Sequence, residues 1–171
     1  MKTKLLLLTA VTLLLALLPL PAADAPKAVE PSPFAAGQWT ISPFGSYRAH
    51  ELGQFNGEWG AGLAASYAVA NNVAIEVETL GEEWQTEPWI DSLKEAGANL
   101  KAYLPIGRSG LAAYGLIGYS HDWQIDENRM NAGAGVEVRA KLVYAFVDGR
   151  WTHDFRTLGH ALFRLGVGVH F

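Results

Sequence analysis

From residue 38 to the last residue, apolar and polar side chains alternate with a period of two. In one segment the odd-numbered positions include Trp59, Leu63 and Tyr67, and most even-numbered positions are glycine, alanine or serine. We call the odd and even positions of a strand its two parities, because side chains of one parity lie on one face. The final segment, residues 160–171, alternates in the same way up to Phe171. Sustained alternation of this kind predicts β-strands that have one apolar and one polar face, and helical spacing fits these segments less well.

Turn signals divide this region into about eight strands with connections of two kinds. Short turns are expected at Asn71-Asn72, at residues 107–110 and near Lys141, whereas the other connections are longer and more polar. An even number of strands, with short turns at one end and longer loops at the other, is typical of an outer-membrane barrel. We therefore predict an all-β fold, an eight-stranded antiparallel up-and-down transmembrane β-barrel over residues 38–171, with strands near 38–50, 58–70, 73–84, 93–106, 111–123, 130–140, 143–154 and 160–171.

The N-terminus has the pattern of a secretory signal peptide. Lys2 and Lys4 precede an apolar run of 16 residues, Leu5 to Leu20, and small residues follow it. The run is shorter than the ~20 residues that a membrane-spanning helix needs. We expect residues 1–23 to be the signal, with cleavage within 22–25, and residues 24–37 to form an extended periplasmic tether.

Composition narrows the possible functions. The chain has 171 residues, no cysteine and a formal net charge of −4. The absence of cysteine excludes a disulfide scaffold, thiolate chemistry and a cysteine-ligated zinc. An acidic chain without a basic run is not expected to bind nucleic acid, and no cofactor is predicted.

The chemistry of the two faces indicates whether the apolar face points into the barrel or outward to lipid. A soluble lipocalin-type barrel would have an apolar interior, and Gly37-Gln38-Trp39 matches the Gly-x-Trp pattern of its first strand. On the polar parity, however, charges of nearly balanced sign are separated by small residues, which suits a crowded barrel interior where each buried charge needs a partner. Aromatic side chains near the strand ends of the other parity are typical of a membrane girdle. The expected interior charge network is Arg48, Glu76, Glu78, Lys101, Glu137, Arg139, Asp148, Arg150 and Arg164.

Three stretches carry a resemblance to a known family: WGAGLAASYAVANNVAIEVE (59–78), LAAYGLIGYSHDW (111–123) and GAGVEVRAKLVYAFVDGRWTHDF (133–155). Together with the alternating C-terminus, they resemble the small eight-stranded barrels related to the membrane domain of outer-membrane protein A. The resemblance implies integral insertion in the outer membrane of a Gram-negative-type envelope. It also implies that the barrel-assembly machinery reads Phe171 as an assembly signal.

An eight-stranded barrel leaves an interior that side chains can fill, so general diffusion as in a porin is not expected. We predict a structural or surface-interaction role, with outer-membrane lipid and the assembly machinery as partners and no identified external ligand. The alternative is a surface adhesin or ligand-binding barrel that uses the loops at 51–57, 85–92, 124–129 and 155–159. A narrow ion path and soluble lipocalin-like binding are less favoured.

Two groups of residues are candidates for a chemical site. His50, His153 and His160 lie at expected strand ends near carboxylates, and imidazoles of this kind bind zinc or copper, although solvated histidines would give the same pattern. Small outer-membrane lipid A deacylases use a serine, a histidine and an acid. Here Ser120 and His121 are neighbours on a strand and point to opposite faces, so we predict no catalysis.

Overall fold

The computed structural model describes residues 32–49, 57–82, 93–107, 110–154 and 159–171. The regular structure in these ranges is entirely β. The eight strands are β1 (Trp39–Ala49), β2 (Glu58–Ala70), β3 (Val73–Glu82), β4 (Leu93–Ile106), β5 (Leu111–Asp122), β6 (Glu127–Ala140), β7 (Val143–Asp154) and β8 (His160–His170).

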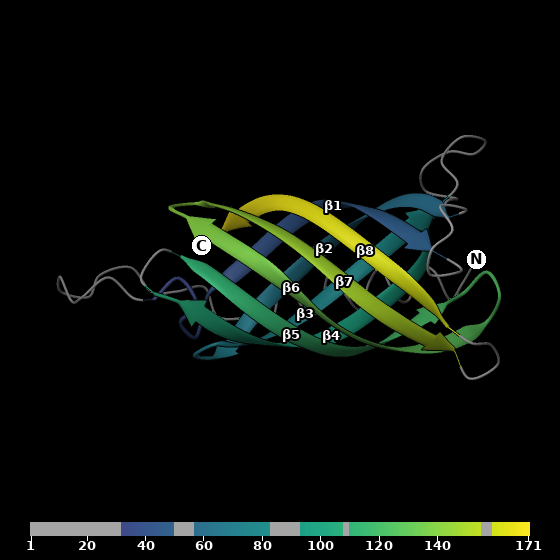
Figure 1. The fold of residues 1–171 in the computed structure, drawn as a ribbon, viewed down its shortest axis with the longest axis horizontal. Coiled ribbons are helices and arrows are strands. Elements are labelled where there is room, and N and C mark those ends of the chain that lie inside the picture. The colour runs from purple at the N-terminus through teal and green to yellow at the C-terminus, as the bar shows by residue number, and fades with distance from the viewer. Residues whose placement is uncertain (1–31, 50–56, 83–92, 108–109, 155–158) are drawn as a thin grey trace. The chain divides into compact units, whose positions relative to one another are not determined.

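Each strand pairs in antiparallel fashion with the next, and β8 pairs with β1 to close the barrel (Figure 1). This architecture confirms the predicted fold class. Following the paired residues around the barrel from Trp39 leads back to β1 at Ala49, ten residues further along the strand. A stagger of this kind tilts the strands relative to the barrel axis, and in Figure 1 they cross the view obliquely.

The connections differ between the two ends of the barrel. At one end, which we call the short-turn end, β2 and β3 are joined by Asn71-Asn72 and β6 and β7 by Lys141-Leu142. Asn72 has φ 63 and Lys141 has φ 53, the left-handed conformation that asparagine accepts readily in turns. We call the opposite end the long-loop end. Most of its connections, residues 50–56, 83–92 and 155–158, lie outside the described residues.

The connection between β5 and β6 is shorter than predicted. Residues 124–129 were expected to be a loop, but β6 begins at Glu127 and the turn spans only residues 123–126. The ladder continues through the pairs His121↔Asn128 and Asp122↔Glu127. A run of polar residues such as Glu127 to Arg129 is typical of a loop. Here the run is part of a strand, in which Asn128 faces outward and Arg129 faces the lumen.

The seam between β1 and β8 is interrupted at Pro43. Trp39 and Phe171 exchange two backbone hydrogen bonds, of 2.7 and 3.0 Å. Because such pairs recur at every second residue of an antiparallel ladder, the register places Pro43 at a bonding position opposite Val167. Proline has no N–H to donate, and the ladder is not formed at this pair.

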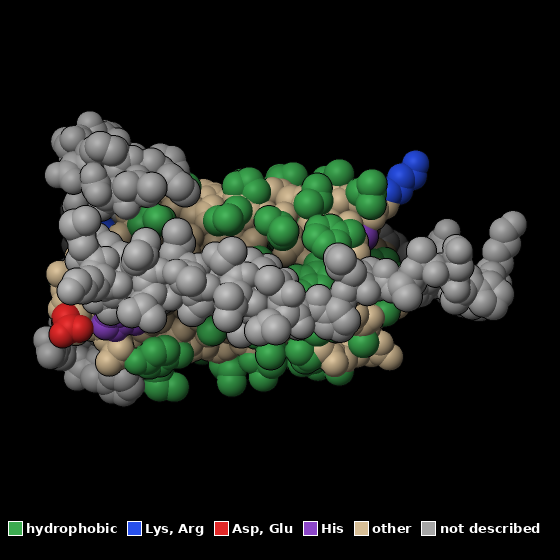
Figure 2. Space-filling model, turned by 180° about the vertical axis from the view of Figure 1, so that it is seen from behind, with side chains coloured by type: hydrophobic (Ala, Val, Ile, Leu, Met, Phe, Trp, Pro, Cys, Tyr) green, Lys and Arg blue, Asp and Glu red, His purple; other side chains and the backbone are tan. Residues whose placement is uncertain are grey.

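Over most of their length the strands have two faces of opposite chemistry. On β4 the neighbours Leu100 and Lys101 are 46% and 1% exposed. The outward side chains that carry the large apolar groups include Trp59, Leu104, Ile117, Leu165 and Phe171. Figure 2 shows this apolar surface, and the charged side chains visible on that view lie toward the ends of the barrel. An apolar exterior around a charged interior is the reverse of a lipocalin-type barrel, so that alternative is wrong.

Glycines on the inward face make room for large neighbours. A Cβ on Gly135 would lie 2.7 Å from the Cζ atom of Tyr114, and one on Gly166 would lie 2.8 Å from the Cζ atom of Phe146. Both distances are too short for real atoms, so a side chain at either glycine would displace an aromatic ring. At these two inward positions a small residue is therefore required by the packing of the lumen.

Candidate functional site

The lumen contains one group of eight charged residues near its middle, which we call the central cluster. Its members project inward from β3, β4, β6, β7 and β8, and all of them except Glu78 are buried. Four are acids and four are bases, so the cluster has no net formal charge. They are Glu76, Glu78, Lys101, Glu137, Arg139, Asp148, Arg150 and Arg164.

Two arginines of the central cluster cross the lumen. Arg150 on β7 contacts Glu78 Oε1 at 2.5 Å and Glu76 Oε1 at 3.0 Å, both on β3. Arg164 on β8 binds Asp148 Oδ2 at 2.6 Å, Glu76 Oε1 at 3.2 Å, and Glu78. In the closed strand order β3 and β7 are opposite walls, separated by three strands on each side. The guanidinium groups therefore brace the barrel across its axis.

Lys101 extends the central cluster toward the short-turn end. Its Nζ atom lies 3.2 Å from Glu76 Oε2 and 3.4 Å from Glu137 Oε2. The same ammonium group lies 4.2 Å from the ring centroid of Tyr114, a distance at which a cation is attracted to an aromatic face. The Tyr114 hydroxyl donates to Asp148 Oδ2 at 2.7 Å. Charges and aromatic rings together fill this part of the lumen.

A second group of charges, the rim cluster, lies toward the long-loop end and consists of Arg48, Glu95, Asp122 and Arg129. Glu95 Oε2 accepts hydrogen bonds from Arg48 at 3.0 Å and Arg129 at 2.8 Å. Arg129 also lies 3.1 Å from Asp122 Oδ2. Among these four residues, only Arg48 belongs to the charge network predicted from the sequence. Glu95 could have been predicted from its sequence position, because it lies an even number of residues from Lys101 and therefore shares the inward face of β4.

The predicted network residues are thus divided between two levels of the lumen. The structure places all nine on the inward face, eight in the central cluster and Arg48 in the rim cluster. Between the two levels the described inward side chains are uncharged, and they include both polar groups and the buried leucines Leu80 and Leu162. Ser46 Oγ, Asn99 Oδ1 and Asn131 Oδ1 are buried there and have no hydrogen-bond partner among the described residues. Groups of this kind are usually satisfied by internal water.

The histidines do not form a common site in the described part of the chain. His153 is exposed on the outer face of β7, whereas His160 is buried on the inner face of β8. These two imidazoles therefore point away from each other across the sheet, and His50 lies outside the described residues. Ser120 is likewise buried on the inner face of β5, while His121 faces outward and contacts Asn128 Oδ1 at 2.9 Å. No group of three potential metal ligands occurs among the described residues.

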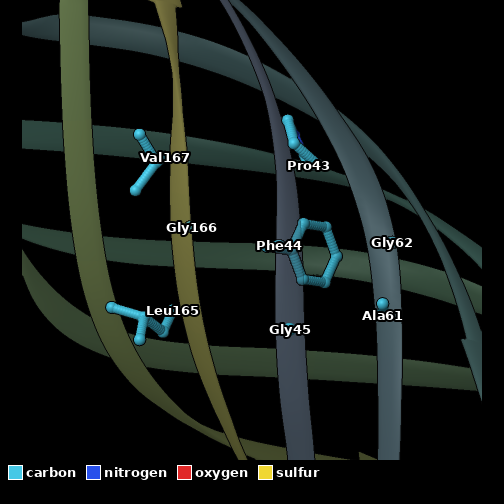
Figure 3. A pocket seen from close by; sticks show the side chains of 8 residues that line it. All are labelled: Pro43, Phe44, Gly45, Ala61, Gly62, Leu165, Gly166 and Val167. Carbon is cyan, nitrogen blue, oxygen red and sulfur yellow. The ribbon is translucent and has the colours of Figure 1, made fainter.

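A shallow groove of about 420 Å³ lies on the outer surface where β8, β1 and β2 adjoin. Figure 3 shows Leu165 and Val167 on β8 and Pro43 on β1 around it, while Gly45 contributes no side chain. Its lining is almost wholly apolar and it coincides with the interrupted ladder at Pro43. The groove therefore belongs to the apolar outer band and to the seam of the barrel.

The C-terminal residue lies at the short-turn end of this seam. Phe171 is 55% exposed and has the same outward parity as Val167 and Val169. Its backbone exchanges hydrogen bonds with Trp39, the first residue of β1. The last residue of the chain thus takes part in closing the barrel.

No helix among the described residues is both long enough and apolar enough to cross a membrane. No family model matches the sequence, and no curated protein does so either. Solved structures, in contrast, match over most of the chain.

The N-terminal β-barrel domain of OprF from Pseudomonas aeruginosa has 15% identity and a TM-score of 0.60, covering 80% of this chain and 98% of that domain. A de novo designed transmembrane β-barrel has 14% identity and a TM-score of 0.61, over 80% of this chain and 97% of the design. Ail, the attachment invasion locus protein of Yersinia pestis, has 16% identity and a TM-score of 0.53, over 80% and 99% of the two chains. The protein thus has the fold of the small eight-stranded outer-membrane barrels, as its resemblance to the membrane domain of outer-membrane protein A predicted.

Proposed function

We propose that the protein is an integral outer-membrane protein with a structural role, whose lumen is closed by the central cluster. The observation that carries this proposal is the cross-lumen bracing, in which Arg150 and Arg164 each reach Glu76 and Glu78 on β3. A continuous path for solutes would require these paired charges to separate within a confined interior, where an unpaired charge is strongly unfavourable. The same bracing argues against a narrow ion path.

The outer surface supports insertion in lipid. Leu104, Ile117 and Leu165 are between 62% and 71% exposed, which would be unfavourable over a whole barrel surface in water. In the bilayer the closed barrel also satisfies its backbone groups between strands. The short-turn end is then periplasmic and the long-loop end is extracellular.

Cell fractionation tests the location, and heat-modifiable gel migration tests whether the protein found there is a folded barrel. We expect it in the outer-membrane fraction, with folded and heat-unfolded forms migrating differently. Recovery as a soluble periplasmic protein would overturn the proposal.

Flux measurements test closure of the lumen. Vesicles that contain the refolded protein are expected to retain small ions and sugars as well as protein-free vesicles do. Steady permeability to either solute would show that the central cluster does not close the barrel, while leaving the membrane location intact.

Surface attachment remains the alternative, since Ail shares this fold and a further structure holds it with the heparin analogue sucrose octasulfate. In this chain such a role would use the predicted loops at 51–57, 85–92, 124–129 and 155–159. Most of their residues lie outside the described part of the chain, whereas the described turn at 123–126 is the short connection between β5 and β6.

A further inference from the structure

The segment before β1 folds back onto the short-turn end of the barrel. The sequence predicts an extended tether for residues 24–37, but in the part that is described, residues 32–37, two turns are formed and Phe34 is only 2% exposed. The Ala35 N–H donates to Ser32 O at 2.9 Å, which closes the first turn. The second turn contains Gly37, whose φ of 87 is readily adopted only by glycine.

Phe34 is packed among side chains that point into the lumen. Its ring centroid lies 5.0 Å from that of Tyr103 on β4, and it shares a buried apolar group with Ala74, Ala112 and Tyr114. These partners come from β3, β4 and β5 and all have inward parity. The ring therefore occupies the mouth of the lumen and does not lie on the outer surface of the barrel.

Arg139 on β6 holds this segment from the opposite side. Its guanidinium carbon lies 4.5 Å from the centroid of Phe34, and its Nη1 atom donates to Pro33 O and to Gln38 Oε1, the latter at 3.0 Å. Its Nε atom binds Glu137 Oε1 at 2.6 Å. Arg139 thus joins the segment to the central cluster.

The turn between β2 and β3 supplies the remaining anchors. The Asn72 N–H donates to Phe34 O at 2.9 Å, and the Ala36 N–H donates to Asn71 Oδ1 at 3.1 Å. The Gly37 N–H donates to Ala68 O at 2.8 Å. The main chain from Phe34 to Gly37 is therefore fixed to one hairpin, which orients the ring toward the lumen.

We infer that residues 32–37 form a stopper that seals the short-turn mouth of the lumen, with Phe34 as the sealing side chain and Arg139 as its positioning residue. The stopper closes the end of the barrel whereas the central cluster braces its middle, and Arg139 is the member of the cluster that links the two. The inference rests on the barrel fold and requires neither the proposed role nor a particular membrane.

The natural absence of cysteine permits a direct test by thiol labelling. Ala112→Cys places a reporter at a fully buried inward position beside Phe34, and Ala74→Cys gives a second reporter on another strand. Lys141→Cys, in an exposed turn at the same end, gives the reference rate. Labelling of the refolded full-length protein by a small water-soluble maleimide is followed by mass spectrometry, and heat-modifiable migration reports folding.

With Phe34 present we expect both reporters to label far more slowly than Lys141→Cys. Phe34→Ala should increase the reporter rates at least about tenfold, because protection of a buried thiol depends on the free energy of local opening. Phe34→Leu should retain most of the protection. Leu142→Ala, which removes an exposed apolar side chain at the same end, should change nothing.

If Phe34→Ala does not fold, Asn71→Ala loosens the stopper by removing its bond to Ala36 and should give a smaller increase in labelling. Reporter rates that stay low in a folded Phe34→Ala barrel would overturn the inference. So would rapid labelling of both reporters when Phe34 is present. Vesicles of folded Phe34→Ala that still retain ions would leave the central cluster as the second barrier, so that the stopper and the proposed closure can fail separately.

Discussion

The outer faces of the strands expose apolar side chains, whereas the inner faces of the same barrel bury charged ones. On β4, Leu100 faces outward and is 46% exposed, whereas the adjacent Lys101 is 1% exposed and lies near two carboxylates. The outer face tolerates exposure of apolar groups and should exclude charge. The inner face tolerates charge because each charged group has partners. The effect of a substitution therefore depends on whether the side chain faces the lumen or the outer surface, and not on its burial alone.

The largest effect is expected where the inner face loses a bracing charge. Arg150→Ala leaves Glu76, Glu78 and Asp148 with fewer partners, and removal of one partner from a buried ion pair costs about 3–5 kcal/mol. The free energy of unfolding in lipid vesicles, measured by urea titration, gives the value. Lys141→Ala, in an exposed turn, is the control. A neutral Arg150→Ala would mean that water already solvates the central cluster.

The outer face should show a comparable effect when it gains a charge. Leu100→Arg is expected to reduce the free energy of unfolding by about 2–4 kcal/mol, because a charged side chain faces lipid near the middle of the membrane. Leu100→Ala, as the matched control, should be mild. The same titration in vesicles measures both. If Leu100→Arg is as stable as the parent, the outer face does not contact lipid at this depth.

Sequence alternation was sufficient to predict the fold because each face must keep one parity over a whole strand. Seven of the eight strands begin within one residue of the predicted position, and β6 is the exception. Its first residues, Glu127 to Arg129, are all polar, and a pattern based on apolar residues has no signal there. The local signal for a strand is lost wherever both faces are polar.

The candidate site was less accessible to sequence reasoning. Parity identifies which charges point inward, but it does not show which charges meet across the lumen. Arg150 and Glu78 belong to strands on opposite walls, and their contact depends on the stagger of the barrel. The segment around Phe34 was missed because it has no periodicity. Its burial depends on contacts with β4 and β6 that only the closed barrel creates.

The rim cluster allows a comparison within the inner face. Arg129→Ala removes a hydrogen bond to Glu95 and an ion pair with Asp122. We expect a loss of about 1.5–3 kcal/mol in the free energy of unfolding, the range for a hydrogen bond to a charged group. The loss should be smaller than for Arg150→Ala because the end of the barrel can admit water to the carboxylates that remain. Urea titration of both variants under the same conditions measures the difference. A larger loss for Arg129→Ala would show that the rim is the drier of the two clusters.

The smallest effect on stability is expected at the end of the outer face. Phe171 lies at the short-turn end, more than half exposed, and its side chain is one of several outward aromatic groups. Deletion of Phe171 should only mildly impair refolding into detergent, since β8 keeps most of its pairs with β1. In cells the same deletion should sharply lower the amount of protein in the outer membrane, if the assembly machinery reads the terminal aromatic residue. Replacement of Phe171 by Leu keeps an apolar end and separates loss of the aromatic ring from loss of the last residue. Equal membrane levels with and without Phe171 would eliminate the assembly signal and leave an aromatic side chain at the membrane interface.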